Sequence, residues 1–139
     1  MPADGWYEWV RTGGGKQPYF MTDPDGGQLA FAGLWAAGRF GLSCTILTTA
    51  ATGRLAAVHD RMPLLLPPDR WDEWLIAEPD AELLAPASPE YLDALEIRPV
   101  GSAVGDVRRD GPELTAAVEI DADSSARSIE SGTGQQPLF

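Results

Sequence analysis

The residues best suited to proton transfer are the only histidine, His59, and the two charged residues that follow it. Imidazole ordinarily titrates near neutral pH, and here a carboxylate, Asp60, and a guanidinium, Arg61, come directly after it in the sequence. This composition is typical of an acid/base site. A structural histidine at the start of a strand explains these residues equally well.

Glu8 is a second candidate for proton transfer, because it lies in an aromatic stretch. The alternation of residues 6–9 predicts a strand in which Glu8 faces away from Tyr7 and Trp9. A carboxylate among large aromatic side chains loses part of its hydration, which raises its pKa toward the range used in acid/base catalysis. The alternative is a glutamate on a solvated strand face, and the alternation alone favours that interpretation.

Several short motifs, in a fixed order along the chain, resemble those of the SOS response-associated peptidase (SRAP) family. They are PADGWYEW at residues 2–9, AGLW at 32–35, the pair Thr48 and Thr49, and HDRMP at 59–63. The resemblance continues through residues 71–75 and ends in VGSAVGDVRRDGPEL at 100–114. Members of this family cap abasic sites in single-stranded DNA through a covalent cross-link, so the resemblance implies a role in DNA repair and the SOS response.

The resemblance also implies a mechanism. An N-terminal cysteine condenses, through its amine and thiol, with the aldehyde of the ring-opened abasic sugar to form a thiazolidine. Glu8 would assist ring opening and Schiff-base formation by proton transfer, and His59 would move protons during ring opening or its reversal. Thr48 and Arg61 would hold phosphates near the lesion, and Trp9 would stack on a neighbouring base.

The sequence departs from the family pattern at the nucleophile. The family's MCGR start and the stretch between it and PADG have no counterpart here, and the chain lacks the asparagine of the family's active site. We expect Cys44 to be buried inside a strand, where it has no free amine for ring formation. The interpretation is a truncated family member, with residues 1–114 forming the C-terminal portion of the domain, and an isolated chain that is inactive in cross-linking.

Composition sets further limits. The formal net charge is -11, which is unfavourable for contacts with DNA phosphates, but the first 62 residues hold five acidic and five basic residues and are therefore neutral. No run of 18 apolar residues is present, so we expect a cytoplasmic, nucleoid-associated protein with no membrane partner. One histidine and one cysteine cannot form a tetrahedral metal site, and there is no nucleotide fingerprint, so no cofactor is predicted.

The expected fold is α+β, a mainly antiparallel and partly open, barrel-like sheet with short helices in an incomplete domain. Turns at the glycines of RTGGGK and at residues 23–27 predict a three-stranded meander that ends in a buried strand over 29–35. Residues 36–42 are predicted to be a short connection. Further strands are expected over 43–49, 62–66 and 96–100, an irregular arm over 104–114, and short helices over 52–58 (capped by Thr52), from Asp69 to about Leu75, over 81–84 and over 89–95.

Residues 115–139 are predicted to form a disordered acidic tail. Its end resembles the peptide with which bacterial proteins bind the sliding clamp, with Gln135 as the amide and Leu138 and Phe139 as apolar anchors. A frayed terminus is the alternative. Two functions therefore compete with a truncated cross-linking protein: a non-catalytic module that binds DNA or the clamp, and a fragment without function. Whether the family chemistry is that of a peptidase (a hydrolase) or of a lyase stays open.

Overall fold

The longest element is a hairpin in which β2 (Gly5–Thr12) pairs with β3 (Gly15–Thr22) in the computed structural model, which describes residues 1–76, 78 and 80–120. The predicted turn is confirmed, since Thr12 pairs with Gly15 around two glycines. The predicted meander is wrong. The other neighbour of β3 is β9 (Glu96–Pro99), so the sheet has the order β2-β3-β9.

Four short strands form a second, curved part of the fold. They pair antiparallel in two pairs: β1 (Pro2–Ala3) with β4 (Leu29–Ala30), and β7 (Thr48–Ala50) with β8 (Arg61–Pro63). Backbone hydrogen bonds of 2.8 Å from Ala32 to Leu64 and from Leu66 to Ala30 connect the two pairs. With two short helices beside these open sheets, the predicted α+β class is confirmed.

The core consists of two buried clusters. They lie on opposite sides of two segments, the one that includes β4 and the one that follows β8. Leu29, Phe31 and Leu65 belong to one buried cluster, whereas Ala32 and Leu64 belong to another. Neighbouring residues of an extended chain point to opposite faces, so a continuous apolar run is a strand that is buried on both faces. The predicted burial of the strand is therefore confirmed at Leu29, Phe31 and Ala32, while Ala30 is partly buried.

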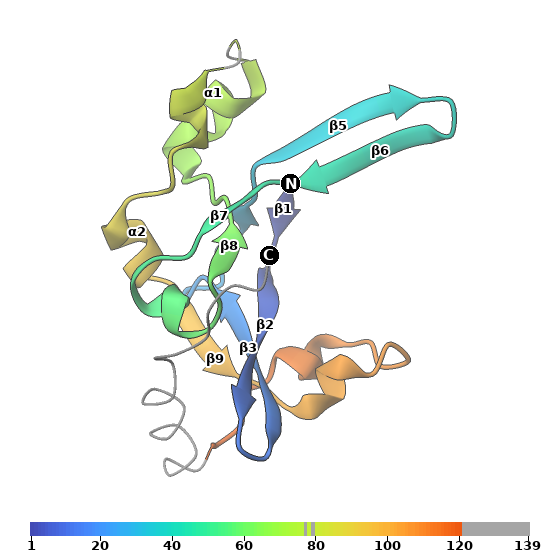
Figure 1. Cartoon of the computed structure of the whole chain (residues 1–139), viewed down its shortest axis with the longest axis vertical. Helices are drawn as coiled ribbons and strands as arrows, with labels where there is room; N and C mark the ends of the chain where they lie inside the picture. Colours follow the sequence, from blue (N-terminus) through green and yellow to red (C-terminus); the bar gives the residue numbers. More distant parts are fainter. Residues whose placement is uncertain (77, 79, 121–139) are drawn as a thin grey trace, which may run out of the picture.

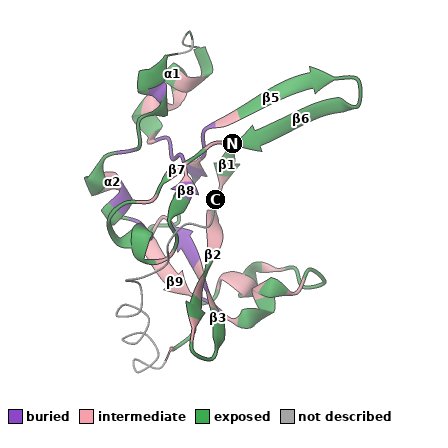
Figure 2. Ribbon diagram, viewed as in Figure 1, coloured by how far each residue is buried: buried purple, intermediate pink, exposed green. Residues whose placement is uncertain are grey.

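Beyond residue 32 the chain leaves the core as a long arm. This arm is a hairpin of β5 (Gly33–Gly38) and β6 (Gly41–Ile46), which projects away from the other strands and is exposed along almost its whole length (Figures 1 and 2). The predicted connection over 36–42 is therefore wrong, and so is the predicted burial of Trp35. Cys44 is also exposed rather than buried, because neither face of the arm packs against a third layer within the described residues.

The helices are short. They are the 3-10 turns η1 (Gly53–Ala57), η2 (Pro68–Arg70), η3 (Ala81–Leu84), η4 (Ser102–Gly105) and η5 (Pro112–Thr115), and the α-helices α1 (Trp71–Ile76) and α2 (Pro89–Asp93). Thr52 occupies the predicted N-cap position of η1 but makes no side-chain cap hydrogen bond. The predicted cap at Asp69 is wrong, because Asp69 lies inside η2 and α1 begins two residues after it. None of the helices in the described part of the chain is long and apolar enough to cross a membrane.

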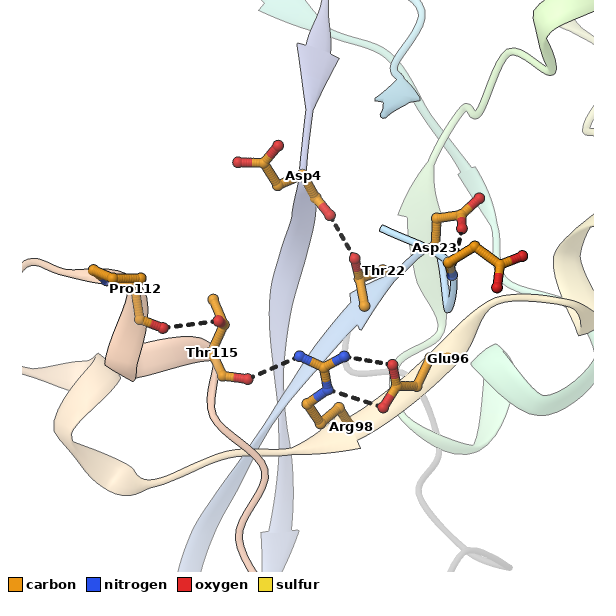
Figure 3. A network of polar contacts seen from close by, with 8 residues as sticks. Asp4, Thr22, Asp23, Glu96, Arg98, Pro112 and Thr115 are labelled. Carbon is orange, nitrogen blue, oxygen red and sulfur yellow. Dashed lines mark hydrogen bonds and ion pairs between the residues drawn. The ribbon is translucent and has the colours of Figure 1, made fainter. Parts of the chain in front are cut away.

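Arg98 connects β9 to the last described segment (Figure 3). Its guanidinium forms a bidentate pair with Glu96 and donates to the carbonyl oxygen of Thr115 at 3.1 Å. The main chain then continues along β9, because the amide of Val118 donates to Pro99 O at 3.0 Å. The division of the chain at residue 114 stays a prediction, and Gln135, Leu138 and Phe139 lie outside the described residues.

Gly5 is the glycine with the least space for a side chain. A Cβ at this position would lie 2.2 Å from Met21 O and 2.5 Å from the ring of Phe20, so the β2–β3 pair would have to separate. We expect Gly5→Ala to lower the free energy of unfolding by about 2 kcal/mol or more, as overpacking does. Urea titration measures this change. Gly13→Ala is the control, because a Cβ there meets nothing within 4 Å, and equal stability of the two variants would contradict the expectation.

Candidate functional site

Glu8 lies in the middle of β2, opposite Tyr19 of β3. The rings of Tyr7 and Trp9 lie 6.4 Å apart on one face of the strand, which leaves Glu8 on the other face. Partial burial raises the pKa of Glu8 above its ordinary value, which is the direction that the aromatic stretch predicts. The charge of His59 lowers this pKa and the charge of Asp60 raises it. Residues 59 and 60 therefore lie close enough to Glu8 of β2 for their charges to affect its pKa.

His59 lies between η1 and β8, one residue after Val58, the C-cap of η1. Its amide donates to Leu55 O at 3.1 Å, which fixes the main chain at this point. The Nδ1 atom lies 3.0 Å from both the amide nitrogen and the carbonyl oxygen of Arg61, and 3.1 Å from Asp60 Oδ1. A neutral imidazole accepts a hydrogen bond from the Arg61 amide there, and a protonated Nδ1 donates to either oxygen.

Both protonation states of His59 Nδ1 therefore have a partner, whereas Nε2 forms no hydrogen bond with any of the residues that the structure describes. The side chain is 45% exposed, so part of the imidazole is accessible to water or to a ligand. A histidine that can gain or lose a proton without losing its local partner is suited to proton transfer.

Arg61 is held against Thr48 across the β7–β8 pair. Its Nη2 donates to Thr48 Oγ1 and to Thr48 O, both at 2.7 Å, and its Nε donates to Thr48 Oγ1 at 3.2 Å. Although both residues are exposed, these contacts fix the guanidinium, and Nη1 forms no hydrogen bond within residues 1–76, 78 and 80–120. A fixed, exposed guanidinium is a good donor to a phosphate oxygen.

The structure connects four of the eight residues that the sequence singles out. Glu8, His59 and Arg61 are connected through the electrostatic effects and hydrogen bonds described above, and Thr48 is connected through Arg61. Trp9 is exposed, but it lies on the opposite face of β2 from Glu8. Asp60, which the sequence places in the acid/base composition directly after His59, acts on Glu8 through its charge.

A partly buried glutamate whose pKa is affected by the charge of a histidine, on an open antiparallel sheet, is an arrangement suited to proton transfer. Comparison with known proteins identifies the family. The family model described as SOS response associated peptidase (SRAP) matches residues 1–107, and the chain belongs to this family. The resemblance of the short motifs is thereby confirmed.

The relatives carry names that describe a DNA lesion. The chain is similar to the abasic site processing protein YedK of Escherichia coli strain K12, with 34% identity over 84% of this chain and 55% of YedK. It is also similar to the abasic site processing protein HMCES of Gallus gallus, with 30% identity over 93% of this chain and 46% of HMCES. The chain thus spans about half the length of the relatives that it matches.

Two crystal structures share the fold. A protein from Bacteroides thetaiotaomicron superimposes with a TM-score of 0.69 at 22% identity, over 86% of this chain and 56% of that protein. A protein from Bordetella bronchiseptica superimposes with a TM-score of 0.62 at 31% identity, over 73% of this chain and 53% of that protein.

Proposed function

We propose that this chain acts in the processing of abasic sites in single-stranded DNA, with Glu8 and His59 as its proton-transfer residues. The observation that carries the proposal is the pKa of Glu8, which burial raises and on which the charges of His59 and Asp60 act. The names of YedK and HMCES support the substrate. A cytoplasmic place at the nucleoid and a part in the SOS response belong to the same proposal.

The proposed chemistry is Schiff-base formation at an aldehyde and does not require hydrolysis of a peptide. The closed abasic sugar opens when a base removes the proton of its C1 hydroxyl and an acid protonates the ring oxygen, which gives the free aldehyde. A raised pKa keeps a fraction of Glu8 protonated at higher pH, so that this residue can act as the acid. In the tautomer whose Nδ1–H donates to Arg61 O or Asp60 Oδ1, Nε2 of His59 has a free lone pair and can accept the other proton.

Contacts with DNA are proposed for the residues around this pair. Arg61, held by Thr48, would donate to a phosphate through Nη1. Trp9 would stack on a base that passes over the opposite face of β2. Binding to the sliding clamp through Gln135, Leu138 and Phe139 is a separate prediction that deletion of these residues tests.

The nucleophile is not supplied at Glu8 by this chain alone. Met1 has no thiol, and its amine donates to Phe31 O at 2.7 Å. Cys44 lies within β6, so its nitrogen is part of a peptide bond and cannot close a thiazolidine ring. The proposed reaction therefore needs an aminothiol from another segment.

We expect the isolated chain to form no covalent adduct with abasic single-stranded DNA. The measurement is a denaturing gel after boiling in detergent, with YedK from Escherichia coli as the positive control. A band that survives boiling would contradict the assignment of the nucleophile to another segment. Preferential binding of abasic over undamaged single strands, measured by fluorescence anisotropy, tests the proposed function itself, and equal affinities would contradict it.

A further inference from the structure

We propose that the end of the β2–β3 hairpin carries a subsite for the undamaged part of a single DNA strand, formed by Trp9, Arg11 and Lys16. We call these three residues the hairpin stripe. Arg11 and Lys16 are the first and last residues of the sequence RTGGGK, whose glycines lie at the turn. The proposal rests on the proposed function, because it gives the same DNA strand a second contact beside the site of Glu8.

Arg11 and Lys16 place two positive charges opposite each other. They are direct partners in the register of β2 and β3, and both side chains are exposed. Like charges at such positions repel each other and destabilise a strand pair. Neither side chain forms an ion pair with another described residue. An anion bound between them would relieve the repulsion, so this position favours a ligand that carries negative charge.

Trp9 lies on the same face of the hairpin as the two charges. It is two residues from Arg11 in β2, and side chains two residues apart in a strand point to the same face. Its partner in β3, Pro18, is fully buried, whereas Trp9 itself is 39% exposed. An exposed aromatic ring followed by cations is the combination that binds single-stranded nucleic acids, because bases stack on the ring and the cations contact phosphates.

The end of the hairpin is accessible to a long ligand. Residues 19–22 of β3 pair with β9, and the hairpin extends beyond this three-stranded part of the sheet (Figure 1). A Cβ at Gly13, Gly14 or Gly15 would meet nothing within 4 Å, which shows that the space around the turn is open. A phosphate backbone can therefore approach the two cations without displacing another described part of the chain.

A single strand suits the hairpin stripe better than a duplex does. The bases of a single strand are free to stack on Trp9, whereas the base faces in a duplex are covered by neighbouring base pairs. Trp9 follows Glu8 directly in the sequence, and Arg11 lies about 7 Å farther along β2. The stripe would thus hold nucleotides that flank an abasic site, through contacts that do not depend on the base sequence.

The salt dependence of binding tests the two phosphate contacts. Fluorescence anisotropy follows binding of the complete chain to an undamaged single-stranded oligonucleotide at several salt concentrations. Each phosphate contact to a single strand adds about 0.7 to the slope of log K against log salt concentration. We therefore expect Arg11→Gln and Lys16→Gln each to reduce this slope by about 0.7, and the double variant to reduce it by about 1.4.

Arg39→Gln is the matched control for charge. It removes one positive charge from an exposed residue in the turn between β5 and β6, a different hairpin, and should leave the slope unchanged. Trp9→Ala tests the stacking contact. It should weaken binding of the single strand by about fivefold or more and leave binding of a duplex of the same sequence unchanged.

Four results would each overturn the proposal: no binding of the undamaged strand by the wild type, an unchanged slope in the double variant, an equal change of slope in Arg39→Gln, or an equal loss of duplex affinity in Trp9→Ala. The proposed function fails separately. A chain that prefers abasic DNA but keeps its slope in the double variant refutes the hairpin stripe alone, whereas a reduced slope without that preference refutes the proposed function alone.

Discussion

Replacement of Glu8 by glutamine is expected to reduce the acceleration of abasic-site capture by about 100-fold, the lower range of general acid/base effects. The assay adds free cysteine as the nucleophile to abasic single-stranded DNA and measures thiazolidine formation with and without the chain. The cysteine amine adds to the aldehyde, water leaves to give the imine, and the thiol closes the ring, so each step needs a proton transfer that glutamine cannot perform.

A measurement of stability distinguishes a loss of catalysis from a loss of folding in the Glu8→Gln variant. Burial raises the pKa of Glu8 above its ordinary value of 4.5, so the folded state binds this proton more tightly than the unfolded chain. The carboxyl group therefore contributes stability below pH 4.5, and this contribution is lost as the pH rises through the folded pKa. Glu8→Gln should be at least as stable as the wild type at pH 7. An unchanged rate of capture would contradict the role of Glu8.

Leu65→Ala is expected to have the largest effect on folding. Leu65 is fully buried, belongs to the main core cluster and forms a bridge with Phe31, so it connects β4 to the segment after β8. Removal of a buried leucine side chain costs about 2–5 kcal/mol, a large part of the stability of a small domain. The measurement is urea unfolding followed by tryptophan fluorescence.

Leu75→Ala is the matched control for this prediction. It removes the same atoms from a side chain that is 78% exposed, so the free energy of unfolding of the isolated chain should change by less than about 0.5 kcal/mol. If the two variants were equally stable, the core would not lie where the structure places it.

Local signals in the sequence predicted local structure well. The glycines of RTGGGK predicted the β2–β3 hairpin. The alternation of residues about Glu8 predicted on which face of β2 these side chains lie. The partner of β3 could not be predicted in this way, because β9 lies more than 70 residues along the chain from β3 and no short-range pattern encodes such a pairing.

The burial of residues in the β5–β6 hairpin could not be predicted from the sequence either. Apolar residues at Leu34, Trp35 and Cys44 predict a buried environment, yet all three are exposed in the β5–β6 hairpin. A pattern of apolar residues shows that a surface needs to be covered, but not which polypeptide covers it. At the candidate site, the contacts of His59 Nδ1 and of Arg61 depend on the fold of the chain between η1 and β8, which the motif HDRMP does not specify.

The central claim is that Glu8 and His59 act in one site, and the titration of the Glu8 side-chain carbon by NMR tests it most directly. His59→Ala should raise the pKa of Glu8, because the histidine charge lowers it, and Asp60→Asn should lower the pKa, because the aspartate charge raises it. Opposite shifts in the two variants are the predicted result. If the pKa of Glu8 stayed at its wild-type value in both variants, the two residues would not share a site.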